Sequence, residues 1–113
     1  MSPNVLVVEE HADLRSAVVS ALKREHYVCD GVRSSDEAVA MLRDHHYAAV
    51  LLAPLLPVNE DPVVRYVLAH DPAEMPTVIL MADPGAPESA GNYATLVKPF
   101  NREQLIAEMA KTH

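Results

Sequence analysis

Five short strand-like runs, most of them apolar and separated by segments of helical pattern, are the feature that most restricts the fold of this chain. They occupy residues 4–8, 27–32, 47–52, 77–82 and 93–97. Short, apolar and partly β-branched runs of this kind are typical of buried strands in a parallel sheet. When strands alternate with helices, right-handed crossovers place helices on both faces. The sequence therefore predicts a doubly wound α/β fold with a five-stranded parallel sheet.

Helices are predicted in most of the intervals between the runs. Apolar residues recur every three or four positions over 13–26. Ser34 and Glu37 have the spacing of a capping box, the 59–62 segment offers a cap before Pro62, and Asn101 opens the last helix. The third helix is predicted to stop near 70–72. Between strands four and five, residues 83–92 leave at most one helical turn because they include Pro84, Gly85, Pro87 and Gly91.

Composition narrows the class of protein. A chain of 113 residues, half of them hydrophobic, is suited to one domain over 1–113. Sixteen acidic residues against nine basic ones give a net charge of −7, which disfavours direct binding to nucleic acid or anionic lipid but is compatible with a basic partner. The single cysteine, the missing secretory signal and the shortness of the apolar run 48–58 predict a soluble, cytoplasmic protein.

Residues that carry chemistry follow the ends of the predicted strands. Glu9 and Glu10 come after the first strand, Ala53 after the third, Met81 at the end of the fourth, and Lys98 after the fifth. Ligand sites of open parallel sheets lie beyond the carboxyl ends of the strands. We therefore expect two carboxylates and one lysine to face one another there, with Lys98 paired to Glu10 or Glu9.

These positions, taken in order, resemble the receiver domain of response regulators in two-component signalling. The resemblance rests on the run 5–10 ending in Glu9-Glu10, on a helix that starts Asp13-Leu14-Arg15, on Pro57 four residues after Ala53, and on Val97-Lys98-Pro99-Phe100. It covers nearly the whole chain. It implies a flavodoxin-like sheet of strand order 2-1-3-4-5, with Pro99 as a candidate cis-proline.

The resemblance also implies a phosphorylation site, and this chain departs from it. Receiver domains accept a phosphoryl group from a histidine kinase on an aspartate that ends strand three, where an acidic pair helps to hold Mg²⁺. Here that position is Ala53, whose methyl group offers no nucleophile. Met81 stands in place of a Ser or Thr hydroxyl, and Thr95 in place of the switch aromatic, with Tyr93 two residues away. Glu9 and Glu10 replace the usual aspartates.

The degenerate phosphorylation site therefore consists of Glu9, Glu10, Ala53, Met81 and Lys98, with no catalytic residue. The loss of a carboxylate at position 53 argues against a bound metal; Glu9 and Glu10 are the only weak candidates for ligands, and no cofactor is expected. The pattern predicts an aspartate-less receiver, or pseudo-receiver. We expect it to act by protein interaction and not as an enzyme, with a histidine kinase or another regulator as partner, or as a homodimer through the strand-five face.

Two other functions are compatible with the same residues. The first is a receiver phosphorylated at a different acidic residue, such as Asp83 or Glu9. The second is a sensor that takes an anionic ligand between Ala53, Met81 and Lys98. An acetyl phosphate assay distinguishes the first from the pseudo-receiver, and a thermal-shift screen tests the second.

The remaining metal-binding and reactive residue types point to structure. His11 beside the glutamate pair leaves too few ligands for zinc or manganese, and adjacent His45 and His46 point apart. Cys29 is expected in the core, as are the methionines at 41, 75, 81 and 109. The three glycines form no nucleotide-binding pattern.

Overall fold

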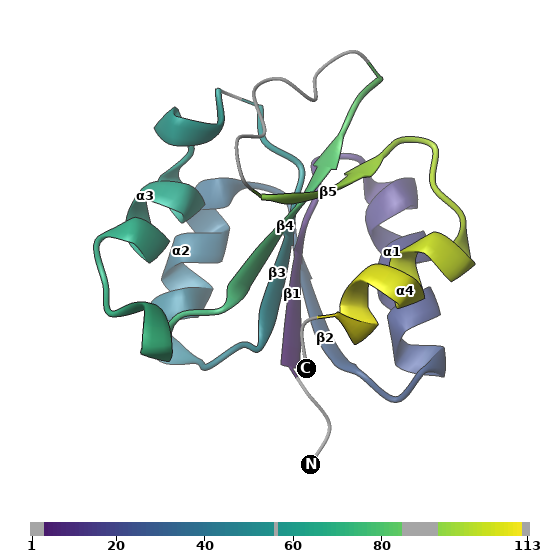
Figure 1. Cartoon of the computed structure of the whole chain (residues 1–113), viewed down its shortest axis with the longest axis horizontal. Coiled ribbons are helices and arrows are strands. Elements are labelled where there is room, and N and C mark those ends of the chain that lie inside the picture. Colours follow the sequence, from purple (N-terminus) through teal and green to yellow (C-terminus); the bar gives the residue numbers. More distant parts are fainter. Residues whose placement is uncertain (1–3, 56, 85–92, 112–113) are drawn as a thin grey trace.

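The computed structural model describes residues 4–55, 57–84 and 93–111 and contains one five-stranded parallel sheet of order β2-β1-β3-β4-β5. In chain order the elements are β1 (Asn4–Val8), α1 (Ala12–Arg24), β2 (Val28–Val32), α2 (Ser35–Asp44), β3 (Ala49–Leu52), the 3₁₀ helix η1 (Val58–Glu60), α3 (Pro62–Leu68), the 3₁₀ helix η2 (Pro72–Glu74), β4 (Thr77–Ala82), β5 (Ala94–Val97) and α4 (Arg102–Ala110). Helices α2 and α3 cover one face and α1 and α4 the other (Figure 1). The predicted doubly wound, flavodoxin-like fold is confirmed.

Capping residues fix where three helices begin, as the sequence predicts. The Ser34 hydroxyl accepts a hydrogen bond from the Glu37 N–H at the start of α2. Asp61 caps α3, and Pro62 is its first residue. Asn101 and Gln104 form a reciprocal capping box on α4. Each cap pairs backbone donors that a helix terminus otherwise leaves without a partner.

Several predicted boundaries are wrong by one to four residues. Helix α1 ends at Arg24 and not at 26, since His26 has a left-handed backbone with φ of 70° that cannot continue a helix. Strand β3 begins at Ala49, the partner of Val5 in the ladder with β1, and β5 at Ala94, the partner of Ile79. Helix α3 ends at Leu68. Most of the predicted short connection 83–92 lies outside the described residues.

Alternate strand residues fill two cores, one on each face of the sheet. Leu6, Val50 and Leu80 face α2 and α3, whereas Val7, Leu51 and Met81 face α1 and α4. Cys29, Met81 and Met109 are buried in the second core and Met41 packs against the first, which confirms these as packing residues; Met75 is half-buried. Nothing in the described part of the chain forms a helix with the length and apolarity needed to cross a bilayer.

Candidate functional site

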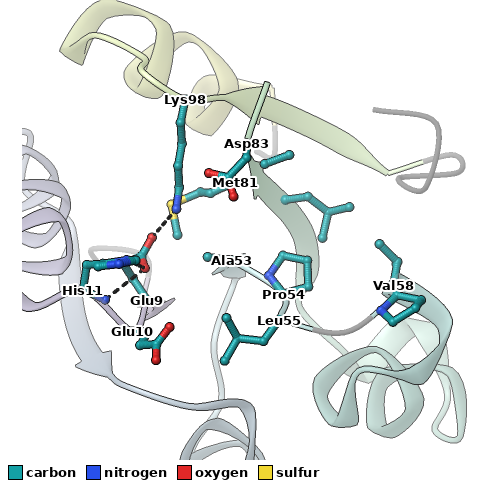
Figure 2. A pocket seen from close by; sticks show the side chains of 13 residues that line it. Glu9, Glu10, His11, Ala53, Pro54, Leu55, Val58, Met81, Asp83 and Lys98 are labelled. Atoms are coloured by element: carbon teal, nitrogen blue, oxygen red, sulfur yellow. Dashed lines mark hydrogen bonds and ion pairs between the residues drawn. The ribbon is translucent and has the colours of Figure 1, made fainter. Parts of the chain in front are cut away.

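The sheet brings the predicted site residues to one edge, beyond the carboxyl ends of its strands. The register pairs Val8 with Leu52, Leu52 with Leu80, and Ala82 with Val97. The residues that follow these positions therefore meet around one opening. Figure 2 shows Glu9, Ala53 and Lys98 around it, coming from the ends of β1, β3 and β5.

Glu9 is the centre of the polar contacts at this edge. Its side chain is only 2% exposed, and Lys98 Nζ donates to its Oε1 at 2.6 Å. The other oxygen, Oε2, accepts from the His11 backbone N–H at 3.1 Å and lies 3.2 Å from His11 Nδ1. The expected pairing of Lys98 with the acidic pair is confirmed, and Glu9 is the partner. Both oxygens of this carboxylate accept a hydrogen bond.

These contacts favour the ionised form of Glu9. Burial acts to raise the pKa of its carboxyl, because a charged group loses hydration there. The hydrogen bonds from Lys98 and His11 outweigh burial, so the pKa of Glu9 lies below its ordinary value. Glu9 and Lys98 therefore form a buried, charge-assisted pair.

The backbone at Glu9 is held as firmly as its side chain. Arg15 Nη1 donates to the Glu9 carbonyl at 2.9 Å, and the Glu9 N–H donates to the Val32 carbonyl at 3.1 Å. The aliphatic part of Arg15 crosses Gly31, where an added Cβ would lie 3.2 Å from Arg15 Cγ. Sequence reasoning missed this support, although the position of Arg15 in the first turn of the helix after β1 was a usable signal.

Glu10 differs sharply from Glu9. It is exposed, whereas Glu9 is buried, so the two glutamates do not act as a pair. His11, considered above only as a metal ligand, instead serves Glu9 as a hydrogen-bond partner. Within the described residues, no group of three or more His, Cys, Asp or Glu side chains is arranged to hold a metal ion, and this includes His45 and His46.

Ala53 and Met81 line the centre of the opening with apolar atoms. The Ala53 N–H donates to the Val8 carbonyl at 3.0 Å, which extends the β1–β3 ladder by one residue and fixes the methyl group at the strand end. Met81 is 1% exposed and packs in the core that faces α1 and α4. The side chains at these two positions supply neither a nucleophilic oxygen nor a hydroxyl.

The opening is a cavity of about 360 Å³. Glu9, Glu10, Asp83 and Lys98 contribute its charged groups, and most of the other lining residues are apolar, from the β3–η1 connection and the end of β4. This volume is near the lower end of the range for small-ligand sites, roughly 300 to 1,000 Å³. The cavity can receive a small group, and it presents carboxylates on an apolar lining.

The two residues predicted as switch positions, Thr95 and Tyr93, lie in β5 and directly before it. Thr95 is within the strand and its hydroxyl donates to the Tyr93 carbonyl at 3.1 Å. Tyr93 precedes the strand, and its ring packs partly buried against the core that faces α2 and α3. The peptide bond between Lys98 and Pro99 is cis, as the resemblance implies.

Cys29 lies away from this edge, on β2. It is buried, and burial raises the pKa of its thiol to about 11. The thiol therefore stays protonated at neutral pH, which confirms its assignment to the core.

Comparisons with known proteins identify the fold. No protein-family model matches the sequence, and no curated protein matches it significantly. Solved structures do match. The receiver domain of a LuxO repressor-like protein from Vibrio parahaemolyticus superimposes with a TM-score of 0.83 at 22% identity, over 99% of this chain and 90% of that one. The chain has the receiver-domain fold.

Two further neighbours show the same fold in different settings. The chemotaxis protein CheY4 from Vibrio cholerae matches over the full length of both chains, with a TM-score of 0.80 and 18% identity. NtrX from Brucella abortus matches over 99% of this chain, with a TM-score of 0.82 and 24% identity. The match covers only 27% of NtrX, which is a longer protein. The receiver fold therefore occurs both as a whole chain and as part of a larger one.

Proposed function

We propose that this chain is a pseudo-receiver: a module of two-component or phosphorelay signalling that binds a protein partner without being phosphorylated at the end of β3. The observation that carries the proposal is the environment of Ala53. A methyl group stands where the receiver resemblance implies an aspartate, and the nearby Glu9 carboxylate is buried and hydrogen-bonded to Lys98 and His11. Phosphoryl transfer needs a nucleophilic oxygen in line with the leaving group, and Ala53 supplies none.

The donor set also argues against Mg²⁺, the ion that the receiver fold implies. Mg²⁺ needs oxygen ligands in near-octahedral geometry. Both oxygens of Glu9 accept hydrogen bonds, from Lys98 and from His11, and Ala53 and Met81 contribute no oxygen from their side chains. Glu10 and Asp83 also line the cavity, but within the described residues no three His, Cys, Asp or Glu side chains are grouped to hold a metal ion. The residues present do not fit this ion, and the function that we propose involves neither a metal nor a catalytic step.

Neither alternative function gains support from the site. An anionic ligand would meet three carboxylates and a single ammonium that Glu9 already binds. Phosphorylation of Glu9 would require breaking the Lys98 pair and exposing a carboxylate that is 2% exposed. Asp83 is exposed, so a phosphoryl donor could reach its carboxylate, and an Asp83→Asn variant tests it.

Intact mass after incubation with acetyl phosphate and Mg²⁺ tests the proposal. We expect no mass change, while an aspartate-bearing receiver domain treated in parallel gains one phosphoryl group. An acid-labile gain of one phosphoryl group would overturn the proposal, and an Asp83→Asn variant would then show whether Asp83 carries it. The interaction itself is tested by a pull-down from the native host with and without acetyl phosphate, in which a pseudo-receiver retains the same partner under both conditions.

A further inference from the structure

The cavity at the strand ends combines an apolar lining with acidic groups. Ala53, Val58 and Met81 contribute apolar atoms, and Pro54 restricts the backbone of the connection after β3. Leu55 also lines the cavity and is 72% exposed. Together with the rest of the apolar lining, it offers contact surface to a ligand that carries apolar atoms of its own.

The charge of the cavity lining favours a ligand of positive charge. Glu9 and Lys98 neutralise each other, so the negative charge that remains belongs to Glu10 and Asp83. Neither of these makes an ion pair or side-chain hydrogen bond within residues 4–55, 57–84 and 93–111, and both are exposed. In the view of Figure 2, Glu10 and Asp83 lie on different sides of Ala53. A cationic group above Ala53 would therefore be approached by carboxylates from the ends of β1 and β4.

We propose that this cavity binds an arginine side chain from a basic segment of the partner protein. This inference rests on the proposed function and names the chemistry of its partner. The aliphatic stem of arginine packs on apolar surface while its guanidinium stays at the wet rim, which matches a lining that is apolar inside and acidic outside. The net charge of −7 attracts the same basic segment over longer distances.

Arginine fits this lining better than the other cations. A divalent ion needs several oxygen ligands close together, and within the described residues no three His, Cys, Asp or Glu side chains are grouped to supply them. Lysine carries a compact and strongly hydrated charge, whereas the planar guanidinium is more weakly hydrated and can donate to two carboxylates through separate N–H groups. We therefore expect lysine to bind at the same place but more weakly.

A titration followed by NMR tests the inference. The ¹⁵N-labelled chain is titrated with a short acetylated and amidated peptide that contains one arginine between glycines. A second peptide carries citrulline, which has nearly the same shape but no charge. We expect the arginine peptide to shift the backbone amide signals of Glu10, Ala53, Leu55 and Asp83, and the citrulline peptide to bind at least several-fold more weakly. Glu10→Gln and Asp83→Asn should each weaken arginine binding by about two- to five-fold, which is the size of a solvent-exposed ion pair.

Glu74→Gln is the matched control, because Glu74 is exposed on η2, before β4, and its loss changes the net charge equally. Binding that Glu74→Gln weakens as much as Glu10→Gln would overturn the inference, since it would then reflect net charge alone. Equal binding of the citrulline peptide would overturn it as well. A third outcome would also overturn it. This is the case in which MgCl₂, but not NaCl at equal ionic strength, shifts the same amide signals and displaces the peptide.

The failure of this inference is separable from failure of the proposed function. A chain that takes up no phosphoryl group and does not bind the arginine peptide contradicts only the inference. A chain that is phosphorylated contradicts the proposed function, whatever the titration shows.

Discussion

Two carboxylates, Glu9 and Asp61, are each 2% exposed but are stabilised by different kinds of donor. Asp61 accepts hydrogen bonds of 2.8 Å from the Val63 N–H and from the Ser35 hydroxyl, both neutral groups. Glu9 accepts from the Lys98 ammonium, 89 residues away in the sequence, as well as from His11. The first carboxylate joins α2 to α3, and the second joins the ends of β1 and β5.

This difference determines the electrostatics of the cavity. Neutral donors satisfy Asp61 without using a cation. Glu9 instead uses the ammonium of Lys98, the single lysine or arginine side chain in the described lining of the cavity. The positive charge that could bind an anion is therefore paired with Glu9, and the cavity retains an excess of negative charge.

Of the substitutions that test this difference between Glu9 and Asp61, replacing Lys98 should change the free energy of unfolding most. Lys98→Ala leaves the Glu9 carboxylate buried without its cation, and removing one partner of a buried pair costs about 3 to 5 kcal/mol. Because Lys98 is 18% exposed, we expect the lower end, about 3 kcal/mol, in the free energy of unfolding measured by urea denaturation.

A second lysine pair provides the control for that measurement. Lys111 pairs with Glu108 at 3.2 Å but is 71% exposed, so Lys111→Ala should change stability little. The double variant Glu9→Gln/Lys98→Ala should recover part of the loss, since no buried charge then remains. An unchanged melting temperature in Lys98→Ala would contradict the view that the Glu9–Lys98 pair stabilises the fold.

Removing the other buried carboxylate should cost less. Asp61→Ala deletes the α3 cap and leaves the Ser35 hydroxyl without its acceptor, for a loss of about 2 kcal/mol. Asp71 offers a matched control, because its side chain accepts from the Ala73 N–H in the same way before Pro72, but it is exposed on a short 3₁₀ helix. If Asp71→Ala costs as much in urea denaturation as Asp61→Ala, burial and the Ser35 contact contribute nothing.

The same two carboxylates show what the sequence can and cannot predict. The role of Asp61 follows from local sequence, because a capping residue directly before Pro62 marks a helix start. The meeting of Glu9 with Lys98 was predicted only because parallel strands carry their carboxyl ends to one edge. The sequence left open whether Glu9 or Glu10 would face Lys98, because that depends on the backbone conformation after Val8, where β1 ends. The link from Tyr47 to Asp30, a 2.7 Å hydrogen bond between segments 17 residues apart, likewise has no local signal.

The backbone support of Glu9 can be tested through Gly31. Gly31→Ala places a Cβ 3.2 Å from Arg15 Cγ, so the Arg15 side chain must shift and its hydrogen bond to the Glu9 carbonyl weakens. We expect a loss of up to about 1 kcal/mol in urea denaturation, the net size of one hydrogen bond. In an Arg15→Ala background the added Cβ meets Val19 Cγ2 at 3.4 Å, an ordinary van der Waals contact, and should not destabilise. Equal losses in the two backgrounds would show that Gly31→Ala does not act through Arg15.

Lowering the pH should reduce the contribution of Glu9 to the free energy of unfolding. We expect this effect to be the smallest of those predicted, because burial opposes the hydrogen bonds that lower the pKa of Glu9. The carboxyl has a lower pKa in the folded chain than its ordinary 4.5, so ionised Glu9 adds stability above that pH. This contribution is lost as the pH falls through the folded value. In urea denaturation at successive pH values from about 7 to 3, the wild type should lose more stability than Glu9→Gln. Glu10→Gln, which removes one negative charge without changing the Glu9–Lys98 pair, is the control for the change in net charge. Parallel curves for the wild type and Glu9→Gln would mean that folding does not favour the ionised form of Glu9.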